Sequence, residues 1–288
     1  KILDVDGVVE RVPGGVIRTG APWCYDRERA ARIQAARDAE AESMLAYQTT
    51  GRCLMEFLRA ALDDPDAAPC GRCANCTGGP DPVDLDPDTV AAAVGHLRAV
   101  NVVLDPRRAW PRGLAAPKGN IRPATRAEAG RALCRVGDSG WWPAVEAVLA
   151  GHDLSDEALG GVATVLRRWG WERRPTWVTW VPSTSSTLPE QLARRIGELG
   201  RLPVHAALVR VRPGRPQGEL ANSTHRCSNV WPAFVVELGG LPGEAIPPGP
   251  VLLVDDTYDS GWTLTVTAHR LREAGAEAVL PFVLARHS

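Results

Sequence analysis

The chain has 288 residues, of which 44% are hydrophobic and 23% charged, and its formal net charge at pH 7 is −1. This composition fits a globular protein of about two or three domains, and it excludes a polycation, so any contact with nucleic acid must come from a local patch. We find no run of about 20 apolar residues that would span a membrane and no signal peptide, and we expect a cytoplasmic protein. The chain begins with Lys1 on a strand-like run at residues 2–5, and we expect it to be a piece of a longer protein.

The first part of the chain is predicted to hold a hairpin and two helices. Residues 1–24 contain a β-hairpin around Pro13-Gly14-Gly15, which we assign to the remnant of a preceding domain. Asp26 can cap a long helix that runs to about Tyr47. A second helix is predicted over residues 52–62, because its leucines and phenylalanine recur at helical spacing.

Four of the seven cysteines cluster beside this second helix, with the spacing Cys53-x16-Cys70-x2-Cys73-x2-Cys76. Thiolates three residues apart on a tight turn can converge on a tetrahedral zinc ion with Zn–S bonds of about 2.3 Å. A site with four sulfur ligands is structural, since no position is left for water or substrate. The alternatives are an iron–sulfur cluster, which thiolates also bind, and four unligated cysteines.

The helical hairpin and the segment Pro69-Cys70-Gly71-Arg72-Cys73-Ala74-Asn75-Cys76 resemble the zinc-binding module of RecQ-family DNA helicases. The resemblance covers about residues 25–78, and we assign residues 25–80 to this module. It implies a structural Zn²⁺, helicase motor domains earlier in the same parent chain, contact with DNA, and a nucleoid-associated location. The motor's phosphate loop, G-x-x-x-x-G-K-[ST], does not occur in the sequence, so the chain itself is not expected to hydrolyse ATP.

Residues 81–172 are predicted to form a separate, mostly helical or winged-helix domain after a linker rich in Gly, Pro and Asp. The pattern predicts a strand at residues 102–104 and helices at residues 87–100, 124–135, 142–150 and 155–169.

A basic segment lies within this middle region. Residues 89–135 contain nine basic and two acidic side chains. Arg107, Arg108 and Arg112, grouped around Trp110, could neutralise phosphates and stack on bases, which predicts binding of single-stranded or tailed duplex DNA. In RecQ helicases a winged helix follows the zinc module, and the resemblance therefore also favours DNA. The alternative is a solvated basic face without a ligand.

Residues 173–288 are predicted to form an α/β domain with a parallel sheet, because short apolar runs alternate with helical segments. The strands are predicted at residues 177–181, 206–211, 251–254 and 279–284, and the helices at residues 189–199 and 263–274.

The most specific motif of this region is the strand Val251–Val254 followed by Asp255-Asp256-Thr257-Tyr258-Asp259-Ser260-Gly261-Trp262-Thr263. Two carboxylates at the carboxyl end of a parallel strand lie where such sheets bind ligands. Hydroxyls and N–H groups at the start of the next helix suit a phosphate. The alternatives are the Walker B strand of an ATPase, for which the phosphate loop is missing, and a strand–turn–helix without a ligand.

The motif resembles the phosphoribosyl-pyrophosphate motif of type I phosphoribosyltransferases. Pro216-Gln217 and Arg226-x-x-Asn229-Val230-x-x-x-Phe234 resemble the ComF-like, competence-associated branch of that family. The resemblance implies that Asp255 and Asp256 hold ribose hydroxyls directly or through Mg²⁺. It further implies that the turn up to Thr263 binds the 5′-phosphate and that Asp259 assists proton transfer.

Two features depart from that family pattern. The candidate pyrophosphate loop, Pro182-Ser183-Thr184-Ser185-Ser186, contains no basic residue. Trp262 stands where the family usually has a small residue, and its indole is expected either to crowd the phosphate pocket or to form part of its wall.

Together, the two motifs resemble the C-terminal region of bacterial RecQ-like helicases that carry a phosphoribosyltransferase-like domain. The expected architecture is a helical-hairpin zinc module, a helical middle domain, and a parallel-sheet domain. The resemblance implies an accessory region of an ATP-dependent 3′-to-5′ DNA helicase. The alternatives are an active phosphoribosyltransferase and a catalytically silent domain that senses a phosphorylated ribose or docks a partner.

Overall fold

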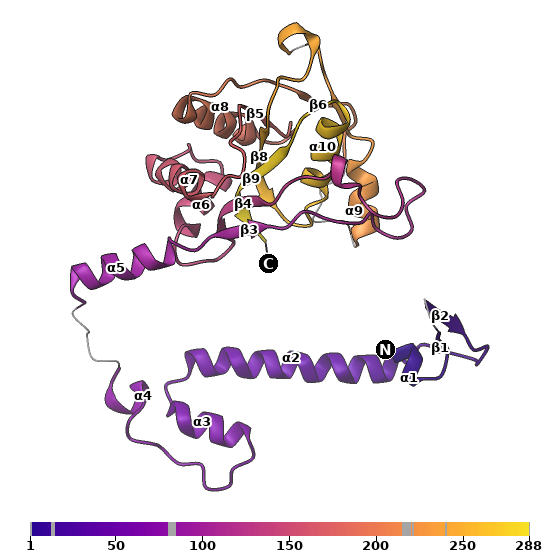
Figure 1. Ribbon diagram of the computed structural model, residues 1–288. Helices are drawn as coiled ribbons and strands as arrows, with labels where there is room; N and C mark the ends of the chain where they lie inside the picture. The colour runs from indigo at the N-terminus through magenta and orange to yellow at the C-terminus, as the bar shows by residue number, and fades with distance from the viewer. Residues whose placement is uncertain are drawn as a thin grey trace. The chain divides into compact units, whose positions relative to one another are not determined.

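The computed structural model describes residues 2–12, 15–79, 85–214, 220, 222–239 and 241–287. The chain divides into two compact units, Lys1–Asp84 and Leu85–Ser288 (Figure 1). The protein is a mixed α/β protein with a five-stranded, mostly parallel sheet and a cysteine cluster that could hold a metal ion.

The first unit is built from a hairpin and helices. Its elements are α1 (Ile2–Val5), β1 (Val9–Val12), β2 (Gly15–Arg18), α2 (Arg27–Thr49), α3 (Leu54–Ala61) and α4 (Ala74–Thr77). The strands pair antiparallel as predicted, while the turn residues Pro13 and Gly14 lie outside the described residues. The strand-like run at residues 2–5 is helical instead.

The long helix α2 begins where its cap predicts, because the Asp26 carboxylate accepts a hydrogen bond from the Arg29 N–H at 2.8 Å. Helix α3 folds back along α2 (Figure 1), and the rings of Tyr47 and Phe57 meet edge to face at 5.6 Å. No residue within α2 or α3 is buried. The helical hairpin therefore has little apolar core, and other contacts must stabilise it.

The second unit contains the sheet and the helices that cover it. Its elements are α5 (Pro87–Leu97), β3 (Val102–Leu104), η1 (Pro123–Thr125), β4 (Gly130–Arg135), α6 (Trp142–Leu149), α7 (Asp156–Arg168), β5 (Trp177–Trp180), α8 (Leu188–Gly200), β6 (Leu208–Arg210), α9 (Ser223–Val230), β7 (Phe234–Val236), η3 (Pro242–Glu244), β8 (Val251–Tyr258), α10 (Trp262–Glu273) and β9 (Val279–Arg286).

The sheet has the strand order β3-β4-β9-β8-β5. Only β3 runs antiparallel to its neighbour, and the other pairs are parallel. A separate ribbon pairs β6 with β7. The predicted strands at residues 177–181, 251–254 and 279–284 are thus confirmed, whereas the strand near residue 208 lies in the ribbon outside the sheet.

Helices cover both faces of the sheet, with α6, α7 and α8 on one side and α9 and α10 on the other (Figure 1). Successive residues of β8 point to opposite faces. Val251 and Leu253 pack in the core beneath α10, and Leu252 and Val254 pack in the core beneath α8. A strand that is apolar at every position is what a central, doubly covered strand requires.

The helix predicted at residues 124–135 is wrong. The segment forms the short turn η1 and then β4, whose Ala132, Leu133 and Cys134 are buried in the sheet. Gly130 opens this strand because a β-carbon there would collide with the main-chain carbonyl of Pro281. An apolar run of this length fits a buried helix as well as a buried strand, and the neighbouring β9 decides between them.

The expected boundary at residue 172 does not appear in the structure either. Strand β4 lies between β3 and β9 in the same sheet as β5, and α6 and α7 pack against that sheet. The middle region therefore supplies part of one α/β unit, residues 85–288, and does not fold as a separate helical or winged-helix domain.

Candidate functional site

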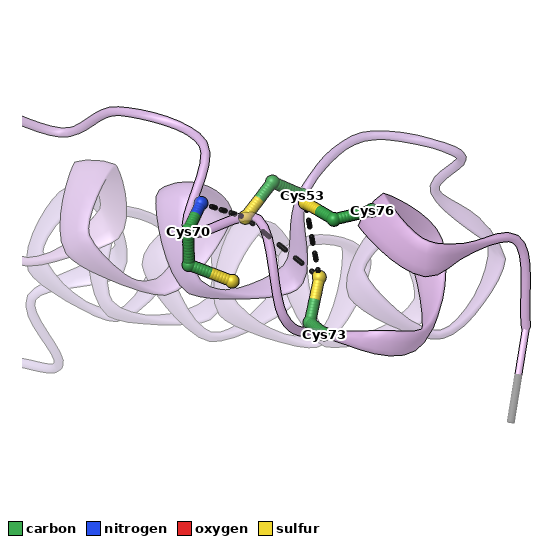
Figure 2. Close-up of side chains that lie close together, drawn as sticks. All are labelled: Cys53, Cys70, Cys73 and Cys76. Atoms are coloured by element: carbon green, nitrogen blue, oxygen red, sulfur yellow. Dashed lines mark hydrogen bonds between the residues drawn. The ribbon is translucent and has the colours of Figure 1, made fainter.

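The four clustered cysteines converge in the first unit. Cys53 is the N-cap residue of α3, and Cys73 is the N-cap residue of α4. All four sulfur atoms lie within 4.8 Å of one another. Figure 2 shows the side chains of Cys53, Cys70, Cys73 and Cys76 gathered at one point between the two helix starts. The sequence spacing predicted this convergence, and the structure confirms it.

The sulfur distances fit a tetrahedral metal. Zn–S bonds of about 2.3 Å place neighbouring sulfurs roughly 3.8 Å apart. The Cys73 sulfur lies 3.8 Å from that of Cys53 and 3.5 Å from that of Cys76. The cluster is therefore compatible with one structural zinc ion held by four thiolates.

Backbone N–H groups favour the thiolate form at two of these cysteines. The N–H groups of Cys70 and Glu56 donate to the Cys53 sulfur at 3.1 and 3.4 Å, and they lower the pKa of that thiol. The N–H of Leu54 donates to the Cys73 sulfur and lowers the pKa of Cys73 to about 6. Thiolates that are crowded and stabilised in this way bind cations well.

The crowding of the sulfur atoms has the opposite effect on Cys76. Its hydrogen bonds with Cys73 and Cys53 raise the pKa of Cys76 to about 11. A bound cation removes this conflict, since it lets all four sulfurs ionise together. Asn75 adds a contact that the spacing did not predict: its side-chain amide donates to the carbonyls of Thr50 and Arg52, both at 2.7 Å, and ties α4 to the start of α3.

The second unit contains a polar cavity of about 390 Å³ at the carboxyl ends of β5 and β8. The loop after β5, residues 181–185, forms one wall. The residues of the acidic motif, Asp255 to Gly261 and Thr263, form the other wall, and Arg210 and Asn229 also line it. The volume lies within the range of small-molecule sites. The structure thus brings together the two segments that were predicted to bind pyrophosphate and ribose phosphate.

The cavity opens at the point where β5 stops pairing with β8. Strand β8 pairs with β9 over its whole length, but it pairs with β5 only through Val254. The last contact is the Val181 N–H bonded to the Val254 carbonyl at 2.9 Å. Beyond it the chain leaves β8, so Asp255 and Asp256 face a space that no neighbouring strand fills.

The acidic pair carries an electrostatic conflict. Burial raises the pKa of Asp255 well above its usual range, and the negative charge of Asp256 raises it further, while the Asp256 N–H and Arg210 act in the opposite direction. The Asp256 carboxylate accepts bonds from the Thr257 N–H at 2.6 Å and the Thr257 hydroxyl at 3.1 Å. Carboxylates placed this way suit hard cations such as Mg²⁺, or hydroxyl donors.

Asp259 lies in the cavity wall but is already paired. Its carboxylate accepts from the Arg226 guanidinium of α9 at 2.7 Å, and the same guanidinium donates to the Leu220 carbonyl at 2.9 Å. Of the ComF-like pattern, Asn229, Val230 and Phe234 line the cavity, whereas Pro216 and Gln217 lie outside the described residues.

Arg210 is a residue that the sequence reasoning missed. It lies at the end of β6, its guanidinium stands 5.3 Å from the Phe234 ring centroid, and among the described residues it is the one cationic side chain in the cavity wall. It can supply the positive charge that the loop after β5 lacks. No local signal sets it apart from Arg212 two positions later, because only the folding of the ribbon brings it to the acidic pair.

Trp262 does not crowd the cavity. Its side chain is 1% exposed and lies in the core, stacked on Trp110 at a centroid distance of 6.2 Å. The residue is the first of α10, and it does not line the cavity, whereas its neighbours Gly261 and Thr263 do. The indole therefore neither crowds the phosphate pocket nor forms its wall, and the prediction that Trp262 contacts the ligand is wrong.

The residues predicted to bind DNA are divided between core and surface. Trp110 is buried among aromatic rings, so it cannot stack on a base. The Arg107 guanidinium is bonded to the Ser260 carbonyl. Arg108 and Arg112 are exposed. Of the residues predicted to contact DNA, Arg108 and Arg112 are therefore accessible, whereas Arg107 and Trp110 are engaged within the protein.

Comparisons with models of known protein families, with curated proteins and with solved structures found no match for this chain. Among the described residues, no helix combines the length and apolar character needed to cross a membrane.

Proposed function

We propose that residues 85–288 bind a phosphorylated ribose of the phosphoribosyl-pyrophosphate type together with Mg²⁺, and that residues 1–84 form a structural zinc module. The single observation that supports the ligand is the cavity in which Asp255, Asp256 and the turn before α10 face the loop after β5. Its size, its acidic pair and its position at strand ends match such a ligand.

The charges of the cavity explain why a metal is part of the proposal. A polyphosphate would be repelled by the carboxylates of Asp255 and Asp256 unless a cation lay between them. Mg²⁺ binds through one or two carboxylates and the phosphates of its ligand, and it would remove that repulsion. The N-terminal end of α10 and the Arg210 guanidinium would then meet the remaining negative charge.

Binding without turnover is the form of this function that the geometry favours. Asp259, which the resemblance assigns to proton transfer, is held in an ion pair with Arg226 and would have to leave it to act. We therefore propose a ligand-sensing domain first and a phosphoribosyltransferase second. If the protein released pyrophosphate from bound phosphoribosyl pyrophosphate, the phosphoribosyltransferase would become the first of the two proposals.

The decisive experiment is titration calorimetry with phosphoribosyl pyrophosphate, in Mg²⁺ and again in excess chelator. We expect heat in Mg²⁺ alone. The pair of substitutions Asp255→Asn and Asp256→Asn should abolish it, whereas Asp153→Asn, on an exposed loop of the same unit, should leave it unchanged. Absence of heat at millimolar ligand in the wild type would refute the proposal.

Arg210 offers an independent test of the same cavity. A charge-assisted hydrogen bond contributes about 1.5–3 kcal/mol, so Arg210→Gln should weaken binding by roughly 10- to 100-fold. Arg212→Gln, on an exposed neighbour outside the cavity wall, is the matched control. Equal affinity of the two variants would show that the ligand lies elsewhere.

For the whole chain, we propose an accessory region of a RecQ-like DNA helicase, with motor domains in the same parent protein. This proposal is supported by the resemblance of the cysteine module and by the convergence of Cys53, Cys70, Cys73 and Cys76.

A further inference from the structure

We propose that Arg107 is a positioning residue of the ligand cavity, which holds the turn between β8 and α10 in the shape that binds an anion. The nature of the anion rests on the proposed function, but the role of Arg107 in shaping the turn does not. The residue belongs to the basic segment that the sequence assigned to DNA.

The contact joins two segments that lie 153 residues apart in the chain. The Nε of Arg107 donates to the Ser260 carbonyl oxygen at 2.9 Å, and one of its terminal nitrogens donates to the same oxygen. The guanidinium also stands over the ring of Trp262, with 4.2 Å between Cζ and the ring centroid. The Arg107 guanidinium thus contacts Ser260 and Trp262, the residues on both sides of Gly261.

Aromatic packing in the core holds both Trp262 and the segment that carries Arg107. Trp262 stacks on Trp110 with an angle of 20° between the rings, and Trp110 meets Trp231 of the segment after α9 edge to face at 5.1 Å. The Trp110 N–H is bonded to the Gly119 carbonyl at 2.9 Å. The segment that carries Arg107 is therefore fixed against the molecule and can act as a rigid support.

A second bond fixes the same segment farther along. The Thr224 hydroxyl of α9 donates to the Arg112 carbonyl at 2.7 Å. The charge of Arg107 is also felt at α9, where it lowers the pKa of Cys227 against the larger effect of burial. Arg107 accordingly lies between α9 and the start of α10, behind the turn and outside the cavity wall.

The direction of the bond has a consequence for the ligand. In a trans peptide the C=O and the N–H point in opposite directions. When Arg107 holds the Ser260 carbonyl, the N–H of Gly261 in the same peptide is turned away from Arg107. Ser260 and Gly261 line the cavity and Arg107 does not, so this N–H is aimed at the space where an anion would bind.

The test compares Arg107→Met, Arg107→Lys and Arg108→Met in the full chain. Arg108 is the matched control, because it is the adjacent arginine and its side chain is exposed. With phosphoribosyl pyrophosphate and Mg²⁺, we expect Arg107→Met to weaken binding by roughly 10- to 100-fold and Arg107→Lys to fall between it and the wild type. Arg108→Met should bind as the wild type does.

Two readouts separate positioning from loss of fold. Added guanidinium ion should restore part of the affinity of Arg107→Ala, which a merely unfolded variant would not show. Without any ligand, the Gly261 amide should shift its NMR signal in Arg107→Met but not in Arg108→Met. If the Gly261 amide and the affinity of Arg107→Met both equal those of the wild type, the proposal is overturned.

The outcomes also separate this inference from the proposed function. If the wild type binds no phosphoribosyl pyrophosphate, the proposed function fails, and the Gly261 amide alone still decides whether Arg107 shapes the turn. If the wild type binds but Arg107→Met has lost only affinity for DNA, Arg107 belongs to a DNA surface and the inference is wrong.

Discussion

Gly261 is the residue whose backbone the ligand turn depends on most directly. Its φ angle is +74°, a conformation that side chains rarely adopt, and the Tyr258 hydroxyl occupies the space that a β-carbon would need. Gly261→Ala should therefore lower the free energy of unfolding by about 1–3 kcal/mol. At roughly 2–4 °C per kcal/mol, the melting temperature should fall measurably in a thermal unfolding experiment.

The control for this substitution lies in α7. Gly160 is exposed in the middle of that helix, and a β-carbon there would meet nothing within 4 Å. Gly160→Ala should stabilise the protein by about 0.5–1 kcal/mol, because alanine favours a helix interior. If Gly261→Ala were as stable as the wild type, the turn would tolerate a side chain and would have a different shape in solution.

Asp255 gives the second prediction at this scale, a pH dependence. Its folded-state pKa is raised, chiefly by burial, so the folded protein holds that proton more tightly than the unfolded chain does. The stability from the neutral carboxyl is complete below the unfolded pKa of about 3.9 and is lost as the pH rises through the folded pKa. Without Mg²⁺, Asp255→Asn should melt above the wild type at about pH 8, and the difference should shrink toward about pH 4.

The comparison variant for this effect is Asp153→Asn, on an exposed loop of the same unit. The measurement is the melting temperature of each protein across the pH range in chelator. An Asp255→Asn variant that melts below the wild type at about pH 8 would contradict the prediction.

At the scale of elements, we expect the fold around α3 and α4 to depend on the cysteine cluster. No residue within α2 or α3 is buried, and Met44 and Leu45 are each 62% exposed, so apolar packing cannot hold these helices together. The cysteine cluster joins the starts of α3 and α4 instead. Metal binding should therefore supply much of the folding free energy of this unit.

This dependence predicts a stoichiometry. Protein purified without added metal should contain about one zinc per chain by elemental analysis. Cys73→Ser should lose that zinc and part of the helical circular dichroism, with residues 50–78 unfolding first. Cys24→Ser removes an exposed cysteine outside the cluster and should keep both. Iron with visible absorbance, or full zinc in Cys73→Ser, would contradict the assignment.

At the scale of the whole molecule, the helicase proposal requires contact with DNA. The chain should bind single-stranded or tailed duplex DNA weakly, with an affinity that falls steeply as salt increases. Since Arg107 supports the turn, the test falls on the exposed pair Arg108 and Arg112. Replacing both by glutamine should reduce the slope of log affinity against log salt by about 2.

The control for the DNA experiment is another exposed arginine pair of the same unit, Arg167 and Arg168 at the end of α7. Their replacement by glutamine should leave the salt slope unchanged. If the two double variants behave alike, Arg108 and Arg112 belong to a solvated face, and DNA contact lies elsewhere in the chain.

The sequence by itself determined those features that depend on near neighbours. The caps Asp26 and Asp86 begin their helices because a carboxylate bonds to an N–H three residues later. The strand before Asp255 is apolar at every position, as a doubly covered strand must be. The cysteines meet because three of them lie within seven residues and the fourth caps the adjoining helix.

Only the tertiary structure decided the features whose partners are distant. Residues 130–135 became a strand because β9, 150 residues later, offers its edge and two covered faces. Arg210 became part of the cavity through the ribbon with β7, and Trp262 entered the core because Trp110 receives it. Arg107 bonds to a carbonyl 153 residues away. No local periodicity records such contacts, because the packing of one segment on another creates them.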